Sequence, residues 1–207
     1  MYVIDFIEAR LPRKVMKKLK DSRLFEVTEE VFDYPTLMAL YDLINRGIIH
    51  IVHGVVAAGK EARIYWGENR KGEDLAIKIY LVTTAEFRKG RLKYIEGDPR
   101  FSRVPRKIRD LVKVWVAKEF KNIQVAWRVG IPAPRVYGFK DNVLVMEFLS
   151  FNRRGVPAPS IKNYPPDDPQ EAFNLIKNFI RILFLKGKLV HADLSEYNIL
   201  NTGDKLY

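Results

Sequence analysis

Apolar and polar positions alternate in two different ways along this chain, and the change between them marks its segments. From Thr36 to Asn45 the apolar residues recur at the spacing of one face of a helix, at Leu37, Leu40, Tyr41 and Ile44. Pro35 stands just before this stretch and Gly47 just after it, as start and stop signals. We therefore expect a short amphipathic helix here, preceded in residues 1–30 by short helical pieces with basic faces.

Between residues 48 and 80 the pattern changes to short β-branched, partly alternating runs. Three runs predict strands, at residues 48–53, 63–66 and 75–80. A loop of small residues, Gly54–Glu61, separates the first two runs, and a turn at residues 69–73 separates the last two. Strands that follow one another this closely are typical of an antiparallel meander.

The next segments predict a long helix and a second hairpin. The helix begins at Pro105 and runs to about Val129, with an apolar stripe at Ile108, Val112, Trp115 and Ile123. The hairpin follows at residues 136–148 and turns at Lys140–Asn142. This part of the chain therefore adds one helix and two strands to the meander.

A loop rich in Pro, Arg and Asn follows at residues 152–168, and this change in composition marks the boundary between two lobes. Asp168 caps the next helix, which Pro169 opens and which ends near Gly187. Because apolar residues occupy several sides of this helix, we expect it to be the core helix of the second lobe.

Two charged residues stand at positions that the pattern predicts to be apolar. Lys78 lies inside the strand Ala76–Tyr80, and Glu119 lies in the apolar stripe of the long helix. Burying either charge alone is costly, so each needs a partner of opposite sign. In protein kinases a strand lysine contacts the α/β-phosphates and a helix glutamate holds it. The alternative for Lys78 is an edge-strand lysine that discourages aggregation.

The loop His191–Asn198 carries the second candidate constellation. Asp193 follows His191 by two positions, and Asn198 follows Asp193 by five. Phosphotransferases of the protein-kinase type use this spacing, in which the Asp accepts the proton of the attacking hydroxyl and the Asn binds magnesium. The alternative is a polar turn in which Asp and Asn serve only turn geometry. Gly54, Gly59 and Lys60 imitate a Walker A loop, but Glu61 cannot supply its hydroxyl and no helix follows.

Composition and charge narrow the class of partner. The 207 residues are 47% hydrophobic, which is enough for a packed core, and cysteine is absent, so we expect a soluble, cytoplasmic protein without disulfides. The N-terminus lacks the uninterrupted apolar run of a signal peptide, and no window is long and apolar enough to span a membrane. The net charge of +11 favours anionic partners such as nucleotides or nucleic acid.

Much of this charge lies in one region. Residues 86–121 contain twelve Lys or Arg and five Asp or Glu, and Gly and Pro interrupt the first half. We therefore expect a mobile loop within residues 83–109, with a basic surface that suits RNA.

Four separated features agree in order and spacing, and they resemble the RIO family of atypical protein kinases. The features are the loop Ala57–Ala62, the strand Ala76–Tyr80, the helix segment Trp115–Glu119 and the loop His191–Asn198. The first reads Ala-Ala-Gly-Lys-Glu-Ala, close to the family's Ser-Thr-Gly-Lys-Glu-Ala. The resemblance extends from about Val31 to the end, and residues 36–48 look like the type-one subfamily, whose kinase domain follows a short helix rather than a winged helix.

The resemblance implies an α+β, bilobal protein-kinase-like fold. An N-terminal helical extension would occupy residues 1–47. The N-lobe would follow at residues 48–149 and would consist of an antiparallel sheet and one long helix. Residues 150–207 would begin a helical C-lobe. It also implies an ATP- and Mg²⁺-dependent enzyme, with Mn²⁺ as an alternative metal, that phosphorylates protein serine or threonine, including its own. Such enzymes act in maturation of the small ribosomal subunit, where they contact the pre-40S or 30S particle and its rRNA, often as ATPases.

Residue roles carry over by position. Lys78 would hold the α/β-phosphates, Glu119 would orient Lys78, and Asp193 would be the catalytic acceptor. Asn198 would be a metal ligand. The nucleotide-binding positions would be Ala57, Ala58, Gly59 and Lys60 around the phosphates, and Met146, Glu147 and Leu149 beside the adenine. Ala192 replaces the arginine with which ordinary kinases read a phosphorylated activation loop, so we do not expect that regulation.

Two positions depart from the family pattern. Ala57 and Ala58 lack the hydroxyls usual in the phosphate loop. The family's second metal-binding Asp, also the site of its aspartyl-phosphate, is expected about a dozen residues after Asn198. The sequence ends at Tyr207, and Asp204 comes too early to replace that Asp. We therefore expect a truncated C-lobe.

Two other functions remain open. One is a catalytically inactive kinase-fold module that binds ribosomal RNA or a pre-ribosome through the basic residues 88–121. The other is a small-molecule kinase of the aminoglycoside or choline type, which shares the His-x-Asp-x-x-x-x-Asn loop, although the Gly59–Glu61 turn and the basic region argue against it.

Overall fold

The computed structural model describes residues 32–82, 94–95, 98, 105 and 107–207. The predictions for residues 1–30 and for most of 83–109 therefore lie outside the described residues. The chain divides into two compact units. The first unit comprises Met1–Glu119 and Tyr137–Met146, and the second comprises Phe120–Val136 and Glu147–Tyr207.

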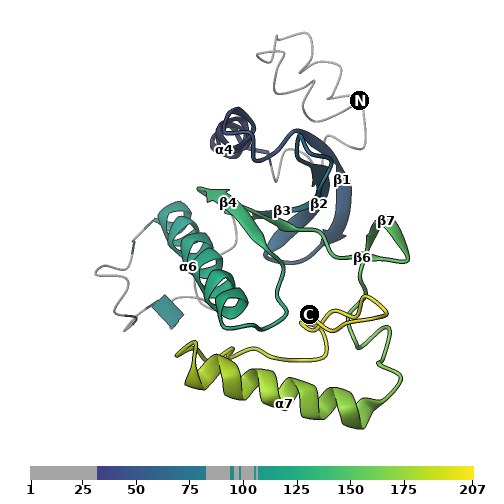
Figure 1. Ribbon diagram of the computed structural model, residues 1–207. Helices are drawn as coiled ribbons and strands as arrows, with labels where there is room; N and C mark the ends of the chain where they lie inside the picture. The colour runs from purple at the N-terminus through teal and green to yellow at the C-terminus, as the bar shows by residue number, and fades with distance from the viewer. Residues whose placement is uncertain (1–31, 83–93, 96–97, 99–104, 106) are drawn as a thin grey trace. The chain divides into compact units, whose positions relative to one another are not determined.

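A five-stranded sheet organises the first unit (Figure 1). Its strand order is β1-β2-β3-β5-β4. Its strands are β1 Ile51–Ala58, β2 Ala62–Glu68, β3 Asp74–Tyr80, β4 Val136–Lys140 and β5 Val143–Glu147. β1, β2 and β3 pair antiparallel in sequence order, which confirms the predicted meander. In the β2–β3 register Ile64 lies opposite Lys78 and Ala62 lies opposite Tyr80.

The first strand is longer than the sequence suggested. β1 continues through Gly54 to Ala58, so the prediction of a loop over residues 54–61 is wrong for its first five residues. Val55 and Val56 are β-branched and continue the strand, and two register shifts in the pairing with β2 accommodate the small residues around them. The true turn is Gly59–Glu61, closed by a 2.9 Å hydrogen bond from the Gly59 N–H to the Ala62 carbonyl.

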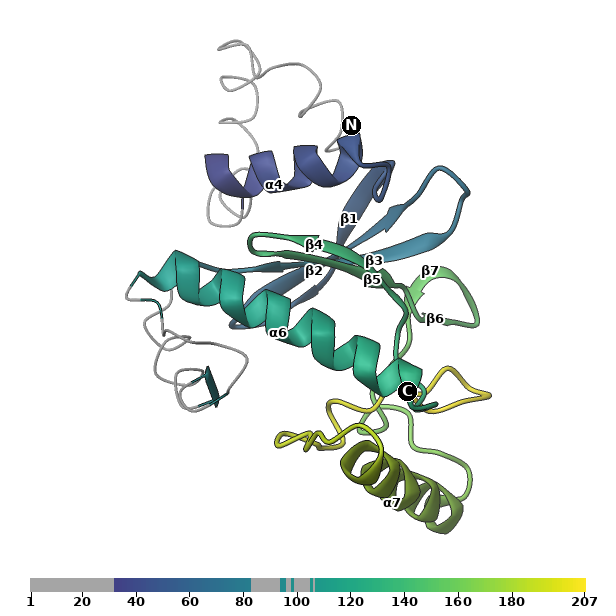
Figure 2. The same ribbon diagram turned by 60° about the vertical axis from the view of Figure 1, so that its left-hand side comes forward.

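One helix covers one face of the sheet. α4 spans Tyr34–Asn45 and begins two residues before the predicted start, because Asp33 caps it and Pro35 fits the first turn. The Asp33 carboxylate accepts a 3.0 Å hydrogen bond from the Thr36 N–H. The buried residues of α4 pack into one core with alternate residues of β3, namely Ala39, Leu40 and Leu43 with Leu75, Ile77 and Ile79. Figure 2 shows α4 on one side of the sheet and α6, Ile108–Arg128, on the other.

α6 departs from the predicted helix at its start and in its buried stripe. It begins at Ile108, three residues after Pro105, and its buried residues are Leu111, Val112 and Val116. Trp115, predicted in the stripe, is instead half-buried and its ring lies 6.4 Å from that of Tyr94. Val112 of the predicted stripe is therefore buried as expected, whereas Leu111 and Val116 are buried in place of Trp115.

The second unit contains α7, Pro169–Leu185, with the predicted cap. The Asp168 carboxylate accepts hydrogen bonds from the backbone of Gln170 at 2.8 Å and Glu171 at 2.9 Å. The prediction of a core helix is wrong for the described residues, because Ala172 is the buried residue of this helix and several large apolar side chains are exposed. The exposed residues are Phe173, Leu175, Ile180, Phe184 and Leu185. Ala172 and Ile176 of α7 pack with Ile199 and Leu206.

A small hairpin replaces the first part of the predicted loop at residues 152–168. It consists of β6, Ser150–Phe151, and β7, Arg153–Pro157, which pair antiparallel. Asn152 turns the chain between them with φ of 60°, a left-handed conformation that Asn tolerates better than most residues. The Pro and Arg content of this stretch therefore predicted a loop where the structure has a short hairpin.

A buried polar network joins α4, the β4–β5 turn and the end of β3 in the first unit. The Asn142 side-chain amide donates 2.9 Å hydrogen bonds to the Thr36 hydroxyl and to the Tyr80 carbonyl. The Tyr80 N–H in turn donates to the Asn142 carbonyl at 2.9 Å. Thr36 and Asn142 are each 1% exposed, so these groups have no solvent to replace a lost partner.

We predict that Asn142→Ala destabilises the fold, because it leaves the Tyr80 carbonyl and the Thr36 hydroxyl without this buried donor. The free energy of unfolding should fall by about 2–4 kcal/mol. Denaturant unfolding measures the change, and Asn45→Ala, at an exposed position of α4, is the control. Equal losses for the two variants would contradict the role of the network.

We also predict a pH dependence from Asp33. Burial raises the pKa of this carboxyl, but hydrogen bonds from Thr36 and the guanidinium of Arg109 together outweigh burial and place the pKa below its ordinary value of 3.8. A lowered pKa stabilises the fold fully above the unfolded value, and this contribution is lost as pH falls through the folded-state pKa. Between about pH 5 and pH 2, unfolding free energy should therefore decline less steeply for Asp33→Asn than for the unsubstituted chain. Identical slopes in denaturant titrations would contradict this assignment.

Candidate functional site

The centre of the candidate site in the first unit is an ion pair between a strand and a helix. Side chains alternate along β3, so Lys78 points away from the face that carries Ile77 and Ile79. The Lys78 Nζ lies 2.7 Å from the Glu119 Oε1, and the two side chains are 25% and 22% exposed. The structure thus brings together the two charges that the sequence singled out, and each partly buried charge has the partner that its position requires.

Tyr80 completes this cluster. Its hydroxyl donates to the Glu119 Oε2, and the Lys78 Nζ lies 4.8 Å from the centre of its ring. Both oxygens of the Glu119 carboxylate are therefore engaged, one by an ammonium and one by a phenol. Tyr80 was not among the predicted site residues, although its place two residues after Lys78 on the same strand face was the available signal.

The predicted phosphate-binding residues lie at the β1–β2 turn of the same unit. Ala57 and Ala58 end β1, and Gly59 and Lys60 form the turn, and all four are exposed. The Arg63 guanidinium donates to the Gly59 carbonyl and so fixes the shape of the turn from β2. The turn lies exposed between two strands, which suits the approach of phosphate oxygens, and the Gly59 N–H is itself engaged by the Ala62 carbonyl.

The second unit carries the predicted catalytic loop. The Asn198 side-chain amide donates to the Asp193 backbone carbonyl at 2.6 Å, and its nitrogen lies 3.5 Å from the Asp193 Oδ2. Ala192, just before Asp193, adopts φ of 63°, which turns the chain sharply at this point. Asp193 and Asn198 are exposed, so the loop presents both side chains together at the surface of its unit.

The predicted adenine-binding segment covers the end of β5 and the residues just after it. Met146 is the last residue of the first unit, and Glu147 and Leu149 belong to the second. The Glu147 N–H donates to the Arg135 carbonyl at 2.7 Å, and its carboxylate accepts from the Arg135 N–H at 3.0 Å. The Leu149 carbonyl accepts from the Ala158 N–H at 2.8 Å. These bonds fix the backbone of the segment within the second unit.

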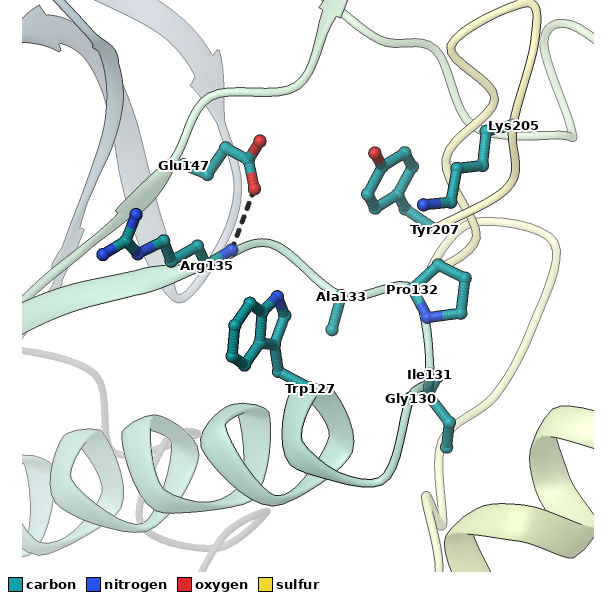
Figure 3. Close-up of a pocket in the computed structure, with 9 residues that line it drawn as sticks. All are labelled: Trp127, Gly130, Ile131, Pro132, Ala133, Arg135, Glu147, Lys205 and Tyr207. Carbon is teal, nitrogen blue, oxygen red and sulfur yellow. Dashed lines mark hydrogen bonds between the residues drawn. The ribbon is translucent and has the colours of Figure 1, made fainter.

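Glu147 and Arg135 also line a cavity of about 420 Å³ in the second unit (Figure 3). The other lining residues are Trp127, Gly130, Ile131, Pro132, Ala133, Lys205 and Tyr207. The figure shows the Glu147 carboxylate directed at the Arg135 backbone, on the side of the cavity nearest the indole of Trp127. The Glu147 side chain therefore stabilises the loop before β4, a role that the sequence did not indicate.

The donor chemistry of the loop fits a magnesium ion. The carboxylate of Asp193 and the amide oxygen of Asn198 are hard oxygen donors, and Mg²⁺ is commonly held by one or two such groups together with substrate phosphates and water. Within the described ranges, no three His, Cys, Asp or Glu side chains gather into a metal site. A metal held at this loop would thus need water or phosphate oxygens as further ligands.

No helix in the described portion of the chain is both long and apolar enough to cross a bilayer.

The family model and the curated relatives agree on one family. The RIO domain model matches residues 63–207. The RIO-type serine/threonine-protein kinase Rio1 of Methanocaldococcus jannaschii is 39% identical over 204 residues, which cover 96% of this chain and 68% of that protein. Rio1 of Haloferax volcanii is 37% identical over 199 residues, with 95% of this chain and 64% of that protein covered.

Solved structures show the fold. The Rio2 kinase of Chaetomium thermophilum, in its ADP/Mg²⁺-phosphoaspartate complex, superimposes with a TM-score of 0.58 at 23% identity, over 80% of this chain and 45% of that one. This likeness confirms the predicted α+β, protein-kinase-like fold. The chain spans about two thirds of the length of the two archaeal relatives and less than half of the solved kinase. From the matched domain and the archaeal identities, the chain belongs to the RIO family of serine/threonine protein kinases, in its Rio1 type.

Proposed function

We propose that the chain is the nucleotide-binding part of an ATP-dependent serine/threonine protein kinase or ATPase that transfers the γ-phosphate of ATP. The observation that carries this proposal is the 2.7 Å ion pair between Lys78 and Glu119, because a strand lysine held by a helix glutamate is what kinases use to bind the α/β-phosphates. The predicted division into an extension at 1–47, an N-lobe at 48–149 and the start of a C-lobe at 150–207 is part of the proposal.

In this proposal the residues act as follows. Lys78 neutralises the α/β-phosphates, and Glu119 keeps its ammonium directed at them. The turn at Gly59 and Lys60, with Ala57 and Ala58 leading into it, covers the phosphates through backbone N–H groups. Because the two alanines offer no hydroxyl, the backbone and Lys60 supply the contacts there.

The adenine lies against Met146 and hydrogen-bonds the backbone of Glu147 and Leu149. The reciprocal hydrogen bonds between Glu147 and Arg135 support this role, since they hold the backbone of Glu147 in one conformation. A pre-organised backbone loses less conformational freedom when a nucleotide binds.

Asp193 accepts or orients the proton of the attacking serine or threonine hydroxyl, and Asn198 contributes an oxygen to a magnesium ion, with manganese as an alternative. The ion, when bound, neutralises charge on the phosphates. The Rio2 structure that shares this fold holds ADP and Mg²⁺, which supports the assignment.

We place the activity at the small ribosomal subunit in the cytoplasm, with the pre-40S or 30S particle and its rRNA as partners and protein serine or threonine, including the chain's own, as acceptor. The net charge of +11 supports an RNA-rich partner. A second candidate, favoured by the same charge, is an inactive kinase-fold module that holds RNA. It requires RNA affinity that falls steeply with salt, without ATP turnover.

We predict that Lys78→Ala weakens MgATP binding to the full-length protein about 10- to 100-fold, because the phosphates lose a charge-assisted hydrogen bond. Isothermal titration calorimetry measures the affinity. Lys71→Ala, which removes an exposed lysine from the β2–β3 turn, is the matched control and should bind as the unsubstituted protein does. Unchanged affinity in Lys78→Ala would contradict the proposed phosphate contact.

We predict that Asp193→Asn retains MgATP binding but loses about 100- to 1,000-fold in the rate of phosphotransfer and ATP hydrolysis, since the hydroxyl proton has no acceptor. Radiolabelled phosphate release and autophosphorylation measure the rate in the full-length protein. Asp167→Asn, an exposed carboxylate beside the α7 cap, is the control.

Full activity in Asp193→Asn would exclude the assigned role. No turnover in the unsubstituted protein, together with salt-sensitive RNA binding, would favour the inactive module. Phosphorylation of aminoglycosides or choline rather than protein would favour a small-molecule kinase.

A further inference from the structure

We propose that Tyr80 is a positioning residue for the nucleotide-binding lysine. Its hydroxyl holds one oxygen of the Glu119 carboxylate and so keeps the other oxygen on Lys78. This inference rests on the proposed function, in which Lys78 binds the phosphates of ATP. It adds a residue that acts through Glu119 and does not itself touch the nucleotide.

The contacts of the Glu119 carboxylate carry the argument. Its Oε1 lies 2.7 Å from the Lys78 Nζ, and its Oε2 accepts from the Tyr80 hydroxyl. A carboxylate bound at one oxygen can rotate about its last side-chain bond, whereas one bound at both oxygens by two fixed donors is held in plane. The direction of the Lys78 ammonium depends on that plane.

Strand geometry places the phenol beside the lysine. Tyr80 follows Lys78 by two residues on β3, so both side chains leave the same face of the sheet. The Lys78 Nζ lies 4.8 Å from the centre of the Tyr80 ring, close enough for a favourable cation–π interaction. The ring thus supports the lysine directly, and the hydroxyl supports it through Glu119.

Tyr80 is itself fixed by its surroundings. It is 2% exposed, and both of its backbone polar groups bond to Asn142, the N–H to a carbonyl and the carbonyl to the side-chain amide, each at 2.9 Å. Asn142 also bonds Thr36 in the first turn of α4. A donor this firmly anchored loses little conformational entropy when it holds the carboxylate, which suits a positioning role.

The competing interpretation is that Tyr80 only fills the core. The two interpretations separate in Tyr80→Phe, which keeps the ring and its packing and removes the hydroxyl alone. If the hydroxyl acts through Glu119, its removal should matter only while Glu119 has a carboxylate that holds Lys78. The effect should therefore vanish in a protein that already carries Glu119→Gln.

The test measures MgATP affinity by calorimetry in the full-length protein for Tyr80→Phe, Glu119→Gln and the double variant. We expect Tyr80→Phe to weaken binding about five- to tenfold, the equivalent of one hydrogen bond to a charged group. In the Glu119→Gln background the same substitution should change affinity less than about twofold.

Tyr65→Phe is the matched control. Tyr65 lies on β2 in the core that packs against α4, it is 6% exposed, and burial raises its pKa to about 12. Removal of the Tyr65 hydroxyl in this variant should leave the MgATP affinity unchanged. Circular dichroism spectra and unfolding midpoints of all variants establish that each is folded.

The outcomes separate this inference from the proposed function. If the unsubstituted protein binds no MgATP, both the proposed function and the inference about Tyr80 are overturned. If Lys78→Ala weakens binding while Tyr80→Phe does not, the function stands and the inference alone is overturned. Equal losses from Tyr80→Phe with and without Glu119→Gln would likewise overturn it, because the hydroxyl would then act independently of the carboxylate.

Discussion

The ion pair between Lys78 and Glu119 is the interaction on which the first unit depends. An ammonium in the middle of an apolar strand is tolerable only if a carboxylate meets it, and that carboxylate comes from a helix more than forty residues away in the chain. The sheet and the first half of α6 must therefore keep a fixed register. The face of β3 that carries Lys78 forms the ion pair. The opposite face, with Leu75, Ile77 and Ile79, packs against α4.

The sequence predicted the features that have a local cause, such as helix ends. It also predicted those marked by a charged residue at a position where the pattern requires an apolar one. The Asp168 cap and Pro169 start of α7 follow from helix-end chemistry, and the structure has both. The partnership of Lys78 and Glu119 could be inferred because each was anomalous in its own element, and two opposite anomalies explain each other. The meander from β1 to β3 followed from the short spacing between strands.

Other features depend on tertiary contacts that no local pattern records. β1 runs on to Ala58 because its partner strand provides hydrogen bonds there, and the small residues of that stretch resemble a loop when read alone. Asn142 looked like a turn residue, yet it is 1% exposed and connects α4 to β3. The apolar residues on several sides of α7 predicted a core helix, whereas the described residues of its unit cover only part of it. Hydrophobicity indicates that a residue can be buried, but not which neighbour buries it.

The charged residues of the two candidate sites differ in their surroundings. Lys78 has an ion-pair partner, whereas Asp193 is exposed. Lys78 is paired with Glu119, because an unpaired, partly buried ammonium would be costly in the folded chain. Asp193 is exposed, and the Asn198 amide donates to its backbone carbonyl at 2.6 Å and makes a longer hydrogen bond of 3.5 Å to its Oδ2. A carboxylate that is to accept a proton or bind a metal must keep its lone pairs available. Contact with water leaves them available, whereas a salt bridge would occupy them. Glu119 is therefore held at both carboxylate oxygens by Lys78 and Tyr80, while Asp193 is held mainly through its backbone carbonyl and its carboxylate stays exposed.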